Sequence, residues 1–143
     1  MKPIEVLLVE DNDGDILLIT EALKEGDFVK KLSVVKDGWE ALNYLAKKEK
    51  YSTATTPDLI LLDINLPKLN GHEVLKQIRA EELLRHIPVI ILSTSSSQED
   101  ISSCYSNFAN CFISKPVNAH EFIMLVSSIK EFWTSTVQLP QTP

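Results

Sequence analysis

Short apolar runs alternate along the chain with longer segments in which apolar residues recur every three or four positions. The short runs predict β-strands at residues 4–9, 32–35, 58–63, 88–92 and 111–113. The longer segments predict helices at residues 13–24, 38–48, 72–83, 99–107 and 119–132, the last of them capped by Asn118. Strict alternation of strand and helix is typical of a parallel sheet with helices on both faces, joined by right-handed crossovers. We therefore expect a three-layer α/β sandwich.

The alternating pattern also predicts how the chain is divided. We expect one domain over residues 1–131 and a short C-terminal extension over residues 132–143, with no output domain. The extension carries Phe132 and Trp133, followed by Val137 and Leu139. Such side chains either pack over the core or anchor an interface, so Phe132 and Trp133 are candidates for a dimer contact.

Composition narrows the classes of partner. With 44% hydrophobic and 24% charged residues, the chain is typical of soluble globular proteins, and its net charge of −6 argues against nucleic acid as a partner. The apolar patch at residues 6–9 is bracketed by acidic residues and is too short for a signal or membrane segment. We expect a cytoplasmic protein without a membrane partner. Cys104 and Cys111 lack Cys-x-x-Cys spacing and are expected to be reduced thiols.

Polar residues stand where the predicted strands end. Glu10 and Asp11 follow the first strand, Asp63 ends the third, a run of hydroxyl residues at 93–97 follows the fourth, and Lys115 follows the fifth. The carboxyl ends of parallel strands share one edge of the sheet, and ligands of open α/β sheets bind beyond that edge. Three carboxylates, a hydroxyl and an ammonium should therefore converge in one site.

The charges of this site indicate its chemistry. Three carboxylates at close range repel one another, which raises at least one pKa or requires a cation. Mg²⁺ is the natural cation, because it prefers oxygen ligands and is commonly held by one or two carboxylates together with a phosphate. Lys115 could hold a further phosphate oxygen, and a carboxylate could attack phosphorus. Asp63, on the most apolar strand, is the candidate nucleophile.

At these residues the sequence resembles the receiver domains of two-component response regulators, and the resemblance covers essentially the whole chain. The matching motifs, in order, are Glu10-Asp11, Asp63 with Pro67 and Gly71 behind it, Thr94, and Lys115-Pro116. The resemblance implies a flavodoxin-like fold with five βα units and strand order 2-1-3-4-5. It also implies a phosphoacceptor switch in a phosphorelay rather than an enzyme, one that catalyses its own phosphotransfer and slow autodephosphorylation.

The resemblance further implies a role for each matching residue. Asp63 would accept a phosphoryl group from a sensor histidine kinase, and Lys115, before a cis peptide bond to Pro116, would pair with the phosphate. The remaining implied roles are Mg²⁺ binding by Glu10, Asp11, Asp63 and the Asn65 backbone carbonyl, switching by Thr94 and Phe112, and rate tuning by Asn65 and Ser96. Glu10 departs from the family's usual Asp, and Phe112 stands where the family often has Tyr. Neither change removes the nucleophile, the metal ligands or the lysine.

A narrower resemblance lies in the C-terminal segment, residues 130–140, and in Ile64-Asn-Leu-Pro67. Both look like the small single-domain response regulators that are paired with cyanobacterial and other bacterial phytochromes. In that subfamily a Phe-Trp extension after the last helix helps to form homodimers. The resemblance therefore implies a homodimer and a light-regulated histidine kinase as phosphoryl donor.

Two other classes of function use similar residues. A phosphatase with an aspartate nucleophile resembles a pattern with a second Asp two residues later, but that position holds Asn65, whose amide cannot donate and recover a proton. A binding or scaffold protein that works without phosphorylation could use the same fold. The scaffold hypothesis stays open at the level of sequence.

Overall fold

Five parallel strands form one sheet in the order β2-β1-β3-β4-β5 in the computed structural model, which describes residues 2–140. Their bounds are β1 (Ile4–Val9), β2 (Val29–Val35), β3 (Leu59–Leu62), β4 (Val89–Ser93) and β5 (Cys111–Ser114). This order places β1 and β3 side by side at the centre, with β2 and β5 at the edges. The predicted fold class and strand order are confirmed.

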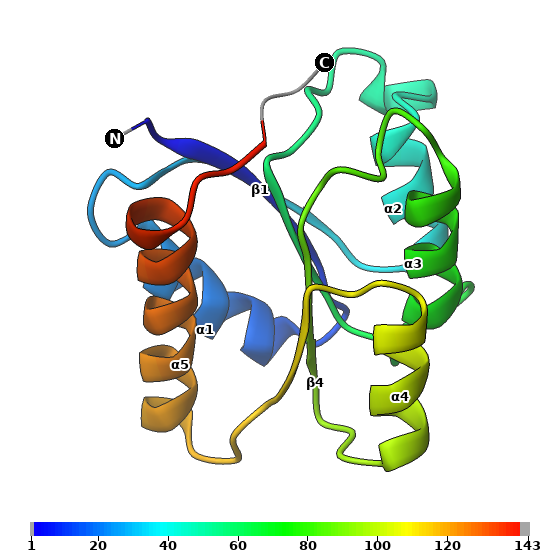
Figure 1. Ribbon diagram of the computed structural model, residues 1–143. Helices are drawn as coiled ribbons and strands as arrows, with labels where there is room; N and C mark the ends of the chain where they lie inside the picture. Colours follow the sequence, from blue (N-terminus) through cyan, green and yellow to red (C-terminus); the bar gives the residue numbers. More distant parts are fainter. Residues whose placement is uncertain (1, 141–143) are drawn as a thin grey trace.

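Helices cover both faces of this sheet (Figure 1). α1 (Asp13–Lys24) and α5 (Ala119–Glu131) lie on one face, and α2 (Gly38–Leu45), α3 (Gly71–Ala80) and α4 (Gln98–Ser106) lie on the other. Asn118 caps α5 as predicted, by accepting a hydrogen bond from the third residue of the helix. Within residues 2–140, no helix is long and apolar enough to cross a membrane.

The hydrophobic core has two halves, one on each face of the sheet. Along β3, Ile60 and Leu62 face the half beneath α2 to α4, whereas Leu59 and Leu61 face the half beneath α1 and α5. Successive side chains of a strand point to opposite faces, so a strand that is covered on both faces must be apolar at every position. This requirement explains the uninterrupted Leu-Ile-Leu-Leu run.

Three elements differ from their predicted bounds by more than one residue at an end. β2 begins earlier, at Val29, because backbone pairing with β1 extends through the exposed Lys30 and Lys31, which suit an edge strand. α2 ends earlier, at Leu45, and Lys47 takes a left-handed φ of 57° that a helix cannot contain. α3 ends at Ala80 rather than at residue 83, since the chain becomes extended at residue 81.

The C-terminal extension continues α5 without a break. A π-helical turn, η2 (Phe132–Thr136), follows directly, and the hydroxyl of Thr134 donates a hydrogen bond to the carbonyl of Lys130. Trp133 packs partly buried against the core half of α1 and α5, whereas Phe132 is 49% exposed. Residues 141–143 of the predicted extension lie outside the described residues.

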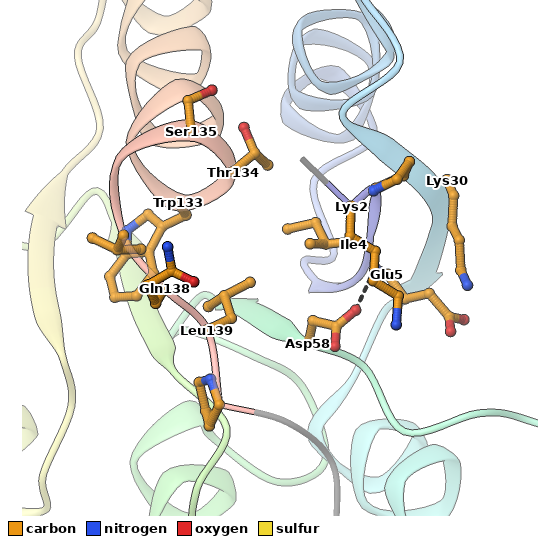
Figure 2. A pocket seen from close by; sticks show the side chains of 13 residues that line it. Lys2, Ile4, Glu5, Lys30, Asp58, Trp133, Thr134, Ser135, Gln138 and Leu139 are labelled. Carbon is orange, nitrogen blue, oxygen red and sulfur yellow. Dashed lines mark hydrogen bonds between the residues drawn. The ribbon is translucent and has the colours of Figure 1, made fainter.

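The last described residues cross the amino ends of the strands. Figure 2 shows Trp133 and Leu139 facing Ile4 and Asp58 across a cavity of about 640 Å³. The carboxylate of Asp58 accepts a hydrogen bond of 2.8 Å from the backbone N–H of Glu5 at its rim. Ile4 and Asp58 stand at the start of β1 and just before β3. This cavity is therefore at the opposite edge of the sheet from the predicted site.

Candidate functional site

The carboxyl ends of the two central strands bring the predicted acids together. Glu10 follows β1 and Asp63 follows β3, and neighbouring strands fix their backbones: Asp63 donates its N–H to the Val9 carbonyl at 3.0 Å. From the edge strand, the Lys115 N–H donates to the Ser93 carbonyl at 2.7 Å, which holds the end of β5 against the end of β4. Strand topology alone thus gathers residues that are 105 positions apart in sequence.

The ammonium of Lys115 lies at the centre of the site. Its Nζ donates to a Glu10 oxygen in a short contact and to Asp63 Oδ2 at 3.1 Å. The three side chains are only 3%, 2% and 8% exposed for Lys115, Glu10 and Asp63, so these ion pairs are shielded from water. Burial alone would lower the pKa of Lys115, but its bonds to the carboxylates, Glu10 first, raise that pKa above its ordinary value. Lys115 is therefore a fixed positive charge.

Glu10 is held on both of its oxygens. Oε1 contacts Lys115, while Oε2 accepts the backbone N–H groups of Asp11 at 3.1 Å and Asn12 at 3.2 Å. Burial, and to a lesser extent the nearby charge of Asp63, together raise the pKa of Glu10 to about 7 against the opposing effect of Lys115. The sequence predicted that repulsion between the carboxylates raises at least one pKa or requires a cation; for Glu10 the larger cause is burial.

Asp63 is oriented by the loop that follows it. Its Oδ1 accepts the backbone N–H of Asn65 at 3.1 Å, which leaves Oδ2 directed at Lys115. The loop returns so closely that a Cβ on Gly71 would lie 2.3 Å from the Asp63 carbonyl oxygen. Only glycine fits this position, because any side chain would push the first turn of α3 away from Asp63.

Glu10, Asp11 and Asp63 also form a possible metal centre. One oxygen from each of these residues lies within 4.8 Å of the others, and Asp11 is exposed while the other two are buried. Lys115 is the one ammonium that contacts this group among the described residues, so negative charge remains in excess. An all-oxygen donor set with this charge and an open side fits a hard divalent cation.

The predicted switch residues, Thr94 and Phe112, and the predicted rate-tuning residue Ser96 lie in the loop after β4 and on β5. Thr94 and Ser96 are exposed in the loop after β4, and no hydrogen bond joins either of them to Asp63 within residues 2–140. Phe112 on β5 is partly buried against the core half of α2 to α4, and its N–H donates to the Tyr105 hydroxyl at 3.1 Å. Among residues 2–140, hydrogen bonds thus join Glu10 and Asp63 to Lys115 but do not include the side chains of the predicted switch residues.

One expectation for this edge of the sheet is wrong. The Lys115–Pro116 peptide bond was expected to be cis, but no peptide bond among residues 2–140 is cis. The trans form is the lower in energy for X–Pro bonds by about 0.5–1 kcal/mol. Lys115 reaches Asp63 with this bond trans.

Sequence reasoning missed one member of the site. Asp15, on the first turn of α1, accepts a hydrogen bond of 2.9 Å from the ammonium of Lys115. The cap of α1 is Asn12, which accepts the N–H of Asp15 at 2.9 Å. Acidic residues are common in first helical turns because of the helix dipole, so Asp15 carried no separate signal. Its position one turn after Asp11 could have suggested that it faces the same site.

A parallel sheet of this order, with carboxylates and a lysine at the carboxyl ends of its strands, defines a receiver domain. The response regulator receiver domain family matches residues 6–127, and the chain belongs to this family. Among individual proteins, it is similar to response regulator Rcp1 from Synechocystis sp.. The two are 38% identical over 138 residues, which are 96% of this chain and 94% of Rcp1.

Solved structures show the same likeness. The crystal structure of phosphorylated RcpA, a cyanobacterial phytochrome response regulator, matches with a TM-score of 0.95 at 44% identity, over 98% of this chain and 100% of RcpA. The crystal structure of the Mn²⁺-bound form of Rcp1 matches with a TM-score of 0.94 at 38% identity, over 97% of this chain and 100% of Rcp1. The predicted resemblance to the small phytochrome-associated regulators is confirmed.

Proposed function

We propose that the protein is a phosphoacceptor switch that takes a phosphoryl group onto Asp63 from a sensor histidine kinase. The observation that carries this proposal is the pairing of Asp63 Oδ2 with the buried ammonium of Lys115, 3.1 Å away, beside the carboxylates of Glu10 and Asp11. A carboxylate nucleophile, a fixed positive charge and a cation-binding cluster are the parts that phosphoryl transfer requires.

The transfer itself uses one oxygen of Asp63. That oxygen attacks the phosphorus of the donor phosphohistidine, the P–N bond breaks, and the imidazole nitrogen keeps the electron pair. Lys115 then turns the N–H that faces Asp63 toward an oxygen of the bound phosphoryl group. The product is an acyl phosphate, which water hydrolyses slowly in the absence of a general base. The protein catalyses this transfer and the slow hydrolysis on its own Asp63.

Glu10, Asp11 and Asp63, with the backbone carbonyl of Asn65, would hold Mg²⁺. When bound, the ion neutralises charge on the phosphoryl group and on the acids. The Mn²⁺-bound form of Rcp1 supports a divalent cation in the family, and the charge and oxygen donors of this site support the smaller, harder Mg²⁺. Glu10 would enter this set as an ionised group, since a metal ligand must lose its proton.

Phosphorylation would then change the surface of the molecule. We assign Thr94 as the hydroxyl that moves to the phosphoryl group and Phe112 as the aromatic side chain that turns inward with it. Asn65 and Ser96 flank the acyl phosphate and tune its hydrolysis. Thr94 is exposed and Phe112 is only partly buried, so both side chains can make these movements.

The likeness to RcpA, a phytochrome response regulator, supports a phytochrome-type histidine kinase as donor.

We further propose that the extension over residues 132–143 forms a homodimer contact through Phe132, whose ring is half exposed, and Trp133. Cys104 and Cys111 are free thiols, which suits a reducing compartment such as the cytoplasm.

The test is to incubate the purified protein with acetyl phosphate and Mg²⁺ and to measure its intact mass. We expect one added phosphoryl group, which is lost in Asp63→Asn and when a chelator removes the metal. Asp58→Asn is the matched control, because Asp58 is the acid at the other end of the same strand. The absence of any adduct across Mg²⁺ and Mn²⁺ concentrations would reject the switch in favour of a scaffold that works without phosphorylation.

A further inference from the structure

The ammonium of Lys115 has three N–H donors, and each meets a different carboxylate. Two of the acceptors, Glu10 and Asp63, stand at strand ends and belong to the proposed metal centre. The third, Asp15, comes from helix α1 and lies 2.9 Å from Nζ. It is absent from the three-residue metal cluster that the described residues form. Asp15 therefore contacts Lys115 but, unlike Glu10 and Asp63, is not one of the proposed metal ligands.

This inference rests on the proposed function, under which phosphoryl transfer changes the three contacts of Lys115 in different ways. Asp63 becomes an acyl phosphate, so its bond to Lys115 must be exchanged for one to the phosphoryl group. Glu10 divides its charge between the lysine and the cation. Asp15 alone can keep its bond to Lys115 before, during and after transfer.

The backbone around Asp15 is built to hold its side chain still. Its N–H is bound by the cap residue Asn12 at 2.9 Å, and α1 packs against α5 and the sheet through Ile19 and Leu23, which are both buried. The side chain of Asp15 is 23% exposed, so it is partly shielded from water at its contact with Lys115. A charge-assisted hydrogen bond on a fixed helix is a directional restraint.

We propose that Asp15 is a positioning residue that aims Lys115. By holding one N–H of the ammonium from the side of α1, it directs another at the oxygen of Asp63 where the phosphoryl group arrives. The alternative role predicts the opposite change in rate. If Asp15 acted only as a negative charge, it would repel an anionic phosphoryl donor, and its removal would speed the reaction.

The experiment measures the rate of phosphorylation by acetyl phosphate over a range of Mg²⁺ concentrations, for Asp15→Ala and Asp15→Asn. In Asp15→Ala the rate at saturating Mg²⁺ should fall about tenfold, while the Mg²⁺ concentration for half-maximal rate stays within about twofold. Asp15→Asn keeps an oxygen acceptor and should retain most of the rate. Asp13→Ala is the matched control, since Asp13 is an acid on the same turn that pairs with Lys36 and is 82% exposed.

A second comparison shows whether Asp15 acts through the lysine. In a Lys115→Met background, Asp15→Ala should change the rate by less than twofold, because the group that it aims is gone. The inference is overturned if Asp15→Ala equals the unmodified protein, if Asp15→Asn loses as much rate as Asp15→Ala, or if the loss persists in the Lys115→Met background. If the unmodified protein gains no phosphoryl group, the proposed function itself fails. Circular dichroism of each variant separates these results from unfolding.

Discussion

At the scale of single residues, the buried charges around Lys115 balance one another only as a set. Glu10 and Asp63 are both desolvated, and each relies on the same ammonium for its opposite charge. Removing one partner of a buried ion pair leaves the others uncompensated, which costs more than the pair itself contributes. The stability of the protein should therefore depend on this lysine in the absence of metal.

Lys115→Met tests this dependence. We expect it to lower the free energy of unfolding by about 3 kcal/mol in a metal-free buffer, because two buried carboxylates lose their counter-charge. Saturating Mg²⁺ should return part of that loss, since the cation supplies positive charge to the same acids. Urea unfolding with and without Mg²⁺ measures both effects. The exposed pair of Lys36 and Asp13 provides the control, as Lys36→Met should lower the free energy of unfolding by only about 0.5 kcal/mol.

Most of the site could be predicted from residues because strand topology places them. Glu10, Asp63 and Lys115 follow apolar strands of a parallel sheet, and every such position shares one edge. Asp15 follows no strand, and its contact with Lys115 depends on how α1 leans against the sheet. That angle is set by side-chain packing between distant segments, which a pattern along the chain does not contain.

At the scale of elements, polar side chains link the loop after β4 to two helices. Ser95, next to Thr94, donates its hydroxyl to Asp100 on α4 at 2.6 Å. The other oxygen of Asp100 lies 3.0 Å from His72 Nε2 on the first turn of α3. These bonds, that of Ser95 first, hold the pKa of Asp100 below its ordinary value. The loop that carries Thr94 is thus tied to α3 and α4.

This link should depend on pH. A carboxyl group with a lowered pKa in the folded state adds stability above its unfolded pKa of about 4, and this stability is lost as the pH falls further. Ser95→Ala should cost about 0.5–1 kcal/mol at pH 7, below the usual range of about 1.5–3 kcal/mol for a hydrogen bond to a charged group, because Asp100 is one-third exposed. Unfolding curves at pH 7 and pH 3 would show the difference shrink. Glu99→Gln, an exposed acid on the same turn, should show no such change.

A second link joins the ends of α1 and α5. Lys130 is buried, and its Nζ donates to the carbonyls of Ala22 at 3.0 Å and Glu25 at 2.8 Å, near the Phe28 ring. Carbonyls at a helix C-terminus carry partial negative charge, so they can stabilise the Lys130 ammonium in place of a carboxylate partner. Lys130→Met should lower stability by about 2 kcal/mol by thermal unfolding, whereas Lys24→Met on the exposed last turn of α1 should not.

Element types followed from the period of apolar residues, but element ends did not. Helix α2 stops at Leu45 even though Ala46 and Lys47 are good helix formers, because the chain turns there with Lys47 in the left-handed region. β2 includes two exposed lysines that no strand pattern predicts, since pairing with β1 supplies its hydrogen bonds. Ends are decided by partners elsewhere in the fold.

At the scale of the whole molecule, the extension has two faces. Trp133 and Leu139 pack against the core half of α1 and α5, whereas the Phe132 ring is half exposed and meets the Trp133 ring in a T-shaped arrangement, with ring centroids 5.6 Å apart. Removing the whole extension would expose the core as well as any interface. A single substitution at Phe132 separates these effects.

We expect Phe132→Ser to convert a dimer into a monomer without lowering the unfolding temperature by more than about 2 °C, because little core contact is lost. Sedimentation velocity of the full chain measures the first effect. Phe108→Ser is the matched control, as Phe108 is 74% exposed at the turn before β5. A chain that ends at Glu131 should be both monomeric and less stable. An unmodified protein that sediments as a monomer would contradict the proposed dimer.

The placement of the aromatic residues has a practical consequence. The protein contains two tryptophans. Trp39 on α2 is 59% exposed, while Trp133 lies partly buried in the extension. Their indole rings therefore emit from environments of different polarity, and a water-soluble quencher should reduce the fluorescence of Trp39 more strongly than that of Trp133. With Trp39 replaced by Phe, the remaining fluorescence comes from the C-terminal segment alone, so the protein carries an intrinsic optical probe of its own proposed interface.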